Sequence, residues 1–106
     1  MKVELDTTTD YGLKKKDVIA IQKIFESFTE IEQAIIYGSR AKGNYKAASD
    51  IDITLKGEKL NTQTLNKIAN QLDDLLLPYT FDLSIHQQIS NGELLEHIKR
   101  VGKIFR

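Results

Sequence analysis

Two carboxylates near the middle of the chain have the spacing of a metal- and phosphate-handling site. Asp50 and Asp52 belong to segment 50–55, in which polar and apolar residues alternate. Such alternation predicts a half-buried strand, so both carboxylates project from one of its faces. Like charges held this close raise each other's proton affinity. A hard divalent cation such as Mg²⁺ would relieve the repulsion, because it prefers oxygen ligands and leaves room for substrate phosphate.

A glycine-serine turn precedes these acids. The apolar segment 33–37 ends at Gly38 and Ser39, and ten residues separate Ser39 from Asp50. Glycine lets backbone N–H groups approach a phosphate closely, and the serine adds a hydroxyl. Arg40 could clamp phosphate oxygens with two parallel hydrogen bonds. A Gly-Ser turn after a strand is common and by itself indicates no function. Gly-Ser followed ten residues later by two acids separated by one residue arises by chance in roughly one per cent of chains this long.

A third acid falls in another alternating segment. Residues 80–86 predict a strand with Asp82 on its polar face. If this strand neighbours strand 50–55, all three carboxylates converge on one exposed sheet face. Three carboxylates together with triphosphate oxygens could hold one or two Mg²⁺ ions.

Other candidate groups are weaker. The spacing of Gly38 and Gly43 fits a P-loop, but Asn44 and Tyr45 follow where Lys-Ser/Thr is required. We expect Tyr37 to pack, and Tyr45 is the better placed of the two to stack on a base. The two histidines, His86 and His97, are expected to be partly buried or on the surface, with His97 solvated on the polar side of the last helix.

The composition indicates one soluble domain. The chain has 106 residues, with 15 basic and 15 acidic side chains and no cysteine. The balanced charge gives no reason to expect direct nucleic-acid binding, and the lack of cysteine excludes a disulfide framework and suits the cytoplasm. We find no signal peptide and no membrane span. Residues 1–12 lack periodicity and are expected to be a loose leader, with a single domain over 13–106.

The predicted elements form a small α+β domain. Apolar spacing predicts helices over 13–30, from 61 or 62 to Pro78, and from a capping box at 90–93 through Phe105. Strands are predicted over 33–37, 50–55 and 80–86, with one helical turn possible at 39–42. A two-layer arrangement, in which helices pack on one face of a small mixed sheet, would bury all three apolar stripes.

The two motifs resemble those of the minimal nucleotidyltransferases of the DNA polymerase beta superfamily. The match lies in Gly38-Ser39-Arg40-Ala41-Lys42-Gly43 and Ser49-Asp50-Ile51-Asp52-Ile53, with Asp82 in Phe81-Asp82-Leu83 as the third acid, and covers about residues 13–98. Position 42 is a lysine, where the family often has arginine. The lysine keeps the positive charge but cannot form the two parallel hydrogen bonds that an arginine makes to phosphate. The resemblance implies two Mg²⁺ ions on Asp50 and Asp52, a catalytic Asp82 and a triphosphate held by Gly38 and Ser39.

Size and resemblance together suggest the acceptor. Larger relatives carry an extra domain for it, and this chain leaves no residues for one, so we expect a protein partner. Similar minimal proteins pair with a small helical HEPN-domain protein, as antitoxin to a toxin RNase, and some transfer AMP from ATP to a tyrosine of that partner. Transfer to a small-molecule hydroxyl, and a binding-only antitoxin without catalysis, stay open as alternatives. The oligomeric state, homo- or hetero-oligomeric, is also left open.

Overall fold

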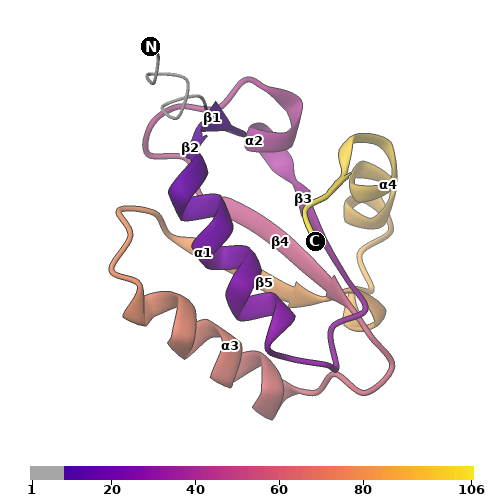
Figure 1. Ribbon diagram of the computed structural model, residues 1–106. Helices are drawn as coiled ribbons and strands as arrows, with labels where there is room; N and C mark the ends of the chain where they lie inside the picture. Colours follow the sequence, from indigo (N-terminus) through magenta and orange to yellow (C-terminus); the bar gives the residue numbers. More distant parts are fainter. Residues whose placement is uncertain (1–8) are drawn as a thin grey trace.

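A four-stranded mixed sheet runs through the molecule (Figure 1). The computed structural model describes residues 9–106. Its main strands, in the spatial order β5-β4-β3-β6, are β5 (Phe81–Ile85), β4 (Ile51–Lys56), β3 (Gln33–Tyr37) and β6 (Lys103–Ile104). Strand β3 is antiparallel to β4 and to β6, whereas β4 and β5 are parallel. A parallel pair needs a crossover connection, and helix α3 (Thr62–Asp74) supplies it.

Two amphipathic helices cover one face of this sheet. Helix α1 (Lys15–Glu26) and α3 lie side by side in front of the strands in Figure 1. The helical stripes and the alternate residues of the strands together form the core, with Val18, Ile21, Phe25, Ala34, Ile36, Ile51, Ile53, Leu55, Ile68, Leu72 and Ile85 all buried. Asn61, one of the two residues at which the sequence allowed this helix to begin, caps α3 by accepting a hydrogen bond from the Thr64 amide at 2.8 Å. The α+β class and the mixed sheet are thus confirmed.

The last helix lies against the opposite face. Helix α4 (Gly92–Val101) contacts β3 and the short helix α2 (Gly38–Lys42), and not the α1–α3 layer as we had expected. Topology explains the difference. The chain leaves β5 at one edge of the sheet and must reach β6 at the other edge, and α1 and α3 already occupy the first face. The N-cap of α4 is Asn91, one residue later than the sequence suggested, and its side chain accepts from the amides of Glu93 and Leu94.

The ends of the described chain differ most from expectation. Strands β1 (Thr9–Asp10) and β2 (Leu13–Lys14) form a hairpin around Tyr11 and Gly12, whose positive φ angles of 58° and 76° suit a two-residue turn. Residues 9–12 of the segment predicted to be a leader form part of this hairpin, and residues 1–8 lie outside the described part. A 3₁₀ turn, η2 (His86–Gln88), follows β5. Helix α4 ends at Val101 rather than running through Phe105, because the chain turns into β6.

Helix α3 ends before its proline. Its last residue is Asp74, and Leu76 adopts a φ of 55°, so the chain has left the helix ahead of Pro78.

None of the helices between residues 9 and 106 is long and apolar enough to cross a membrane.

Candidate active site

Two of the predicted acids are direct neighbours across β4 and β5. Asp52 and Asp82 are register partners, and both project from the sheet face that α1 and α3 leave uncovered. Neighbouring strands lie about 4.8 Å apart, so the two side chains stand side by side. Asp50 lies two residues before Asp52, just outside β4. Asp50 and Asp82 are exposed, whereas Asp52 is half-buried. The three carboxylates therefore gather at one end of this face, which we call the acid face.

The charges of the three acids are coupled. The pKa of the Asp52 carboxyl is raised to about 6, chiefly by burial and then by the charges of Asp82 and Asp50, while the Arg40 guanidinium opposes the shift. A carboxylate whose proton affinity is raised in this way is one that a cation would stabilise. Within the described residues, however, no three acidic, histidine or cysteine side chains are arranged closely enough to hold a metal ion as they stand. Asp50, Asp52 and Asp82 thus lie on the same sheet face, but their carboxylates are not close enough to surround a metal ion by themselves.

The glycine-serine turn touches the central acid. Gly38 begins α2 directly after β3 and has a φ of 77°, a conformation that side chains with a Cβ rarely adopt. A Cβ at this position would overlap Oδ2 of Asp52. Glycine is thus required twice, by the backbone angle and by the carboxylate that fills the space. The turn and the acid face meet here, with Ser39 as the next residue of the turn.

His97 holds the turn from the other side. The Gly38 amide donates a hydrogen bond to His97 Nε2 at 3.2 Å, and the imidazole packs edge-on against Tyr37 with ring centres 6.1 Å apart. The expectation of a solvated His97 is therefore wrong, and the Gly38 amide is already occupied in this structure. The sequence did contain a signal for it. His97 lies three residues after Leu94 and four before Val101, which is the spacing of the apolar stripe of α4.

Arg40 has a structural role in place of the expected phosphate contact. Its side chain is 2% exposed, and its guanidinium donates to the backbone oxygens of Tyr11, Ala47 and Ser49 at 2.9–3.2 Å. The rings of Tyr45 and Tyr79 lie 5.3 and 5.2 Å from it. Tyr45 thus contacts Arg40 rather than presenting a free ring. Because Ser49 immediately precedes Asp50, Arg40 fixes the loop that delivers the first acid to the acid face.

A row of hydroxyl groups behind the acids was not singled out from the sequence. Ser84 Oγ donates to Thr54 Oγ1 at 2.9 Å, and this register pair lies two residues beyond Asp52 and Asp82. Burial raises the pKa of the Tyr37 phenol, a hydrogen bond with Ser84 opposes the shift, and the charges of Asp82 and Asp52 add to it. Thr54 is fully buried, so the acid face is open at the carboxylates and closed immediately behind them. The alternation of the two strands could have predicted this, because Thr54 and Ser84 lie two residues after Asp52 and Asp82 and so share their face.

His86 lies at the far end of the acid face. It follows β5 in η2, and burial lowers the pKa of its imidazole, with a further contribution from the Lys56 charge. Asp82 and His86 are four residues apart along the chain, about 13 Å in extended conformation. His86 therefore lies on the same side of the sheet as the acids, about the length of a strand away from them.

Comparison with known proteins agrees with this geometry. Residues 20–105 match the family model described as polymerase beta, nucleotidyltransferase. A protein of Methanocaldococcus jannaschii named "Putative protein adenylyltransferase MJ1547" is 38% identical over 82 residues, which cover 68% of this chain and 67% of that protein.

Solved structures share the fold. A chain in the crystal structure of a toxin-antitoxin with AMP-PNP superposes with a TM-score of 0.67 at 20% identity, covering 89% of this chain and 73% of that one. A structure of the tri-AMPylated Shewanella oneidensis HEPN toxin in complex with MNT antitoxin gives 0.64 at 18% identity, covering 87% and 71%. The family match spans most of the sequence, and the turn and acids that suggested it are adjacent in space. The chain belongs to the polymerase beta nucleotidyltransferase family and shares the fold of these structures.

Proposed function

We propose that this protein transfers AMP from ATP to a hydroxyl group of a partner protein. The observation that carries the proposal is the contact of three elements at one point: Asp52 stands beside Asp82 in register, and the Gly38 turn closes against the Asp52 carboxylate. The name of the Methanocaldococcus jannaschii relative supports protein adenylylation as the reaction. AMP-PNP in a structure of the same fold supports ATP as the nucleotide.

The acids are the proposed metal ligands and catalytic groups. Their carboxylate oxygens are the donors that Mg²⁺ prefers, and the raised pKa of Asp52 indicates negative charge that a cation would compensate. Because the three acids do not form a closed cage, Asp50, Asp52 and Asp82 would hold Mg²⁺, two ions in our proposal, together with oxygen atoms from the substrate. When bound, Mg²⁺ neutralises phosphate oxygens and the departing pyrophosphate.

The turn at Ser39 is the proposed phosphate-binding element, and Asp82 is the proposed proton acceptor. The Ser39 hydroxyl and the turn around it would hold the triphosphate. Asp82 lies on the edge strand β5 and is exposed, so an acceptor hydroxyl can approach it. As the acceptor oxygen bonds to the α-phosphorus and the bond to pyrophosphate breaks, Asp82 would take the hydroxyl proton. Arg40 is not assigned a phosphate contact, because its donors are used within the protein.

The proposed acceptor is a HEPN-domain protein, with this chain as the antitoxin of the pair. The support is the recurrence of the fold in a complex of an AMPylated HEPN toxin with MNT antitoxin. The reaction is tested by mixing the protein with Mg²⁺, α-labelled ATP and the product of the neighbouring gene. We expect label on the partner. Asp52→Asn should abolish it, whereas Asp74→Asn, an exposed acid at the end of α3, should label normally.

The same assay separates the alternatives. Equal labelling by Asp52→Asn and the unmodified protein would reject the assigned site. Label on a small hydroxyl compound but not on the partner would favour small-molecule transfer. A partner that is still neutralised by the Asp50→Asn, Asp52→Asn double variant would favour a binding-only antitoxin.

A further inference from the structure

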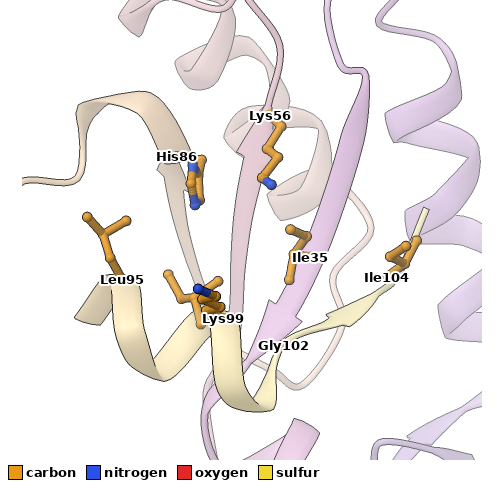
Figure 2. Close-up of a pocket in the computed structure, with 8 residues that line it drawn as sticks. Ile35, Lys56, His86, Leu95, Lys99, Gly102 and Ile104 are labelled. Carbon is orange, nitrogen blue, oxygen red and sulfur yellow. The ribbon is translucent and has the colours of Figure 1, made fainter. Parts of the chain in front are cut away.

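A groove lies at the end of the acid face opposite the three acids. It runs between the sheet and α4 and has a volume of about 550 Å³ (Figure 2). Its walls are largely aliphatic, with Ile35 from β3, Leu95 and Ile98 from α4 and Ile104 from β6. The Ile104 side chain is 66% exposed at the rim. An aliphatic groove with an exposed isoleucine at its rim offers a surface that another molecule can cover.

The polar groups of this groove are basic. Lys56 from β4, Lys99 from α4 and His86 from η2 line it, and no Asp or Glu among the described residues 9–106 does so. Figure 2 shows the three side chains grouped around the same space. Between residues 9 and 106 the one salt bridge joins Arg106 to Glu26, so neither lysine is neutralised by that part of the chain. Burial lowers the pKa of His86, and the nearby Lys56 charge lowers it further.

The groove and the carboxylates share one surface at a defined separation. Asp52 and Lys56 alternate to the same face of β4, four residues apart, which is about 13 Å. The hydroxyls of Thr54 and Ser84 lie between them. A molecule seated in the groove would thus lie one strand length from the acids.

We propose that this groove docks an acidic and apolar segment of the acceptor protein and so presents its hydroxyl to Asp52 and Asp82. The inference rests on the proposed protein acceptor. A segment with both an aliphatic and a carboxylate side chain satisfies the whole groove, whereas a small anion would leave the aliphatic walls uncovered. The 13 Å separation corresponds to about four extended residues or nine helical residues. The docked acid and the modified hydroxyl should therefore be that far apart, if one continuous segment supplies both.

Charge reversal in the groove tests the docking. The variant Lys56→Glu, Lys99→Glu is compared with Lys59→Glu, Lys67→Glu, two exposed lysines that do not line the groove. The purified neighbouring-gene product is titrated by calorimetry, and its labelling is measured over a range of partner concentrations. We expect the groove variant to bind the partner about tenfold or more weakly and to raise its KM without changing kcat, and the control to behave as wild type. The wild-type affinity should fall as salt is raised.

The outcomes distinguish this inference from the proposed function. Binding that depends on the two lysines, without any labelling, would support docking and reject the transfer reaction. Equal partner affinity in the groove and control variants would overturn docking. Loss of ATP affinity in the groove variant, or a dimer of this chain that the reversal dissociates, would also overturn it by assigning the groove to nucleotide or to a second copy. If the reversal unfolds the protein, Lys56→Gln, Lys99→Gln removes the charges with less disturbance and is judged by the same criteria.

Discussion

At the scale of single residues, Asp52 is held in a state that opposes folding. Its side chain is half-buried, its register partner is another carboxylate, and Asp50 adds a third charge. A structural surface gains nothing from such an arrangement, because each ionised group disfavours the others. Ionisable groups whose pKa is strongly shifted by burial and neighbouring charges are concentrated at functional sites, where they lower stability but serve binding or catalysis.

Replacing Asp52 should therefore stabilise the protein in a pH-dependent way. Its pKa is about 6 in the folded state, above the ordinary value of 3.8. Between these values the folded state binds more protons than the unfolded state, so stability falls as pH rises, and the full penalty is present above pH 6. After allowance for solvent screening, we expect Asp52→Asn to raise the free energy of unfolding by about 1–2 kcal/mol at pH 8, with the gain vanishing near pH 4.

Urea unfolding of both proteins across this pH range measures the difference. Asp74→Asn, a substitution of an exposed acid at the end of α3, serves as the control. Added Mg²⁺ should reduce the difference in free energy of unfolding between the two proteins at pH 8, because it stabilises the unmodified protein more than the variant. Parallel stability curves for wild type and Asp52→Asn would contradict the coupling of the three charges.

Two glycines allow backbone strain to be separated from the contact with Asp52. Gly38 and Gly43 both have positive φ, 77° and 92°, but a Cβ at Gly38 would meet the Asp52 carboxylate and one at Gly43 would meet nothing within 4 Å. We expect Gly43→Ala to cost about 1–2 kcal/mol from the backbone alone and Gly38→Ala about 2–4 kcal/mol. In an Asp52→Ala background the two costs should converge, because the clash is gone. Chemical denaturation of the four variants gives the result, and an unchanged difference would show that Asp52 does not occupy this space.

At the scale of secondary-structure elements, α4 stabilises the turn that the site depends on. It crosses the sheet on the acid-bearing side, and His97 accepts the hydrogen bond of the Gly38 amide. In His97→Ala this amide loses its partner, which we expect to destabilise the protein by about 1 kcal/mol and to speed exchange of the Gly38 amide hydrogen. His97→Gln, whose side-chain oxygen can accept the bond, should restore part of the protection. Glu96→Ala, an exposed neighbour on α4, is the control, and equal exchange in all three would argue against the bond.

The sequence predicted the elements that have strong periodicity and missed those that depend on contacts between distant residues. Strand Gln33–Tyr37 was predicted with the bounds that are observed, and strands β4 and β5 to within one residue at either end. Strands of two residues, such as β2 and β6, carry no period to detect. For the same reason the turn and the acids could be identified from spacing, whereas the partners of Arg40 and His97 are backbone atoms, which the sequence does not display.

At the scale of the whole molecule, one topological choice creates both surfaces. Because α1 and α3 occupy one face of the sheet, α4 must cross the other to connect the edge strands β5 and β6 (Figure 1). It covers that face only in part. On the face that the sequence predicted to be exposed, α4 thus leaves the carboxylates open at one end and the groove at the other, with the buried Thr54 hydroxyl between them.

Strand β6 anchors this arrangement, and its neighbouring residues face in opposite directions. Phe105 is buried against Phe25 and Tyr11, and its backbone oxygen accepts from Gln22 Nε2 at 2.8 Å, whereas Ile104 lies exposed at the groove. We expect Phe105→Ala to lower the free energy of unfolding by about 3–4 kcal/mol, because it leaves a cavity between α1 and the hairpin.

The adjacent substitution should have the opposite profile. Ile104→Ala removes a side chain that is already in water, so stability should change by less than about 0.5 kcal/mol, while affinity for the acceptor protein falls several-fold through loss of a groove wall. Denaturation curves and partner titration on the two variants test the contrast. A stable Ile104→Ala that binds the partner normally would remove β6 from the docking surface, and a Phe105→Ala that unfolds like wild type would remove it from the core. Both results together would mean that the path of α4 across the sheet is held by something other than β6.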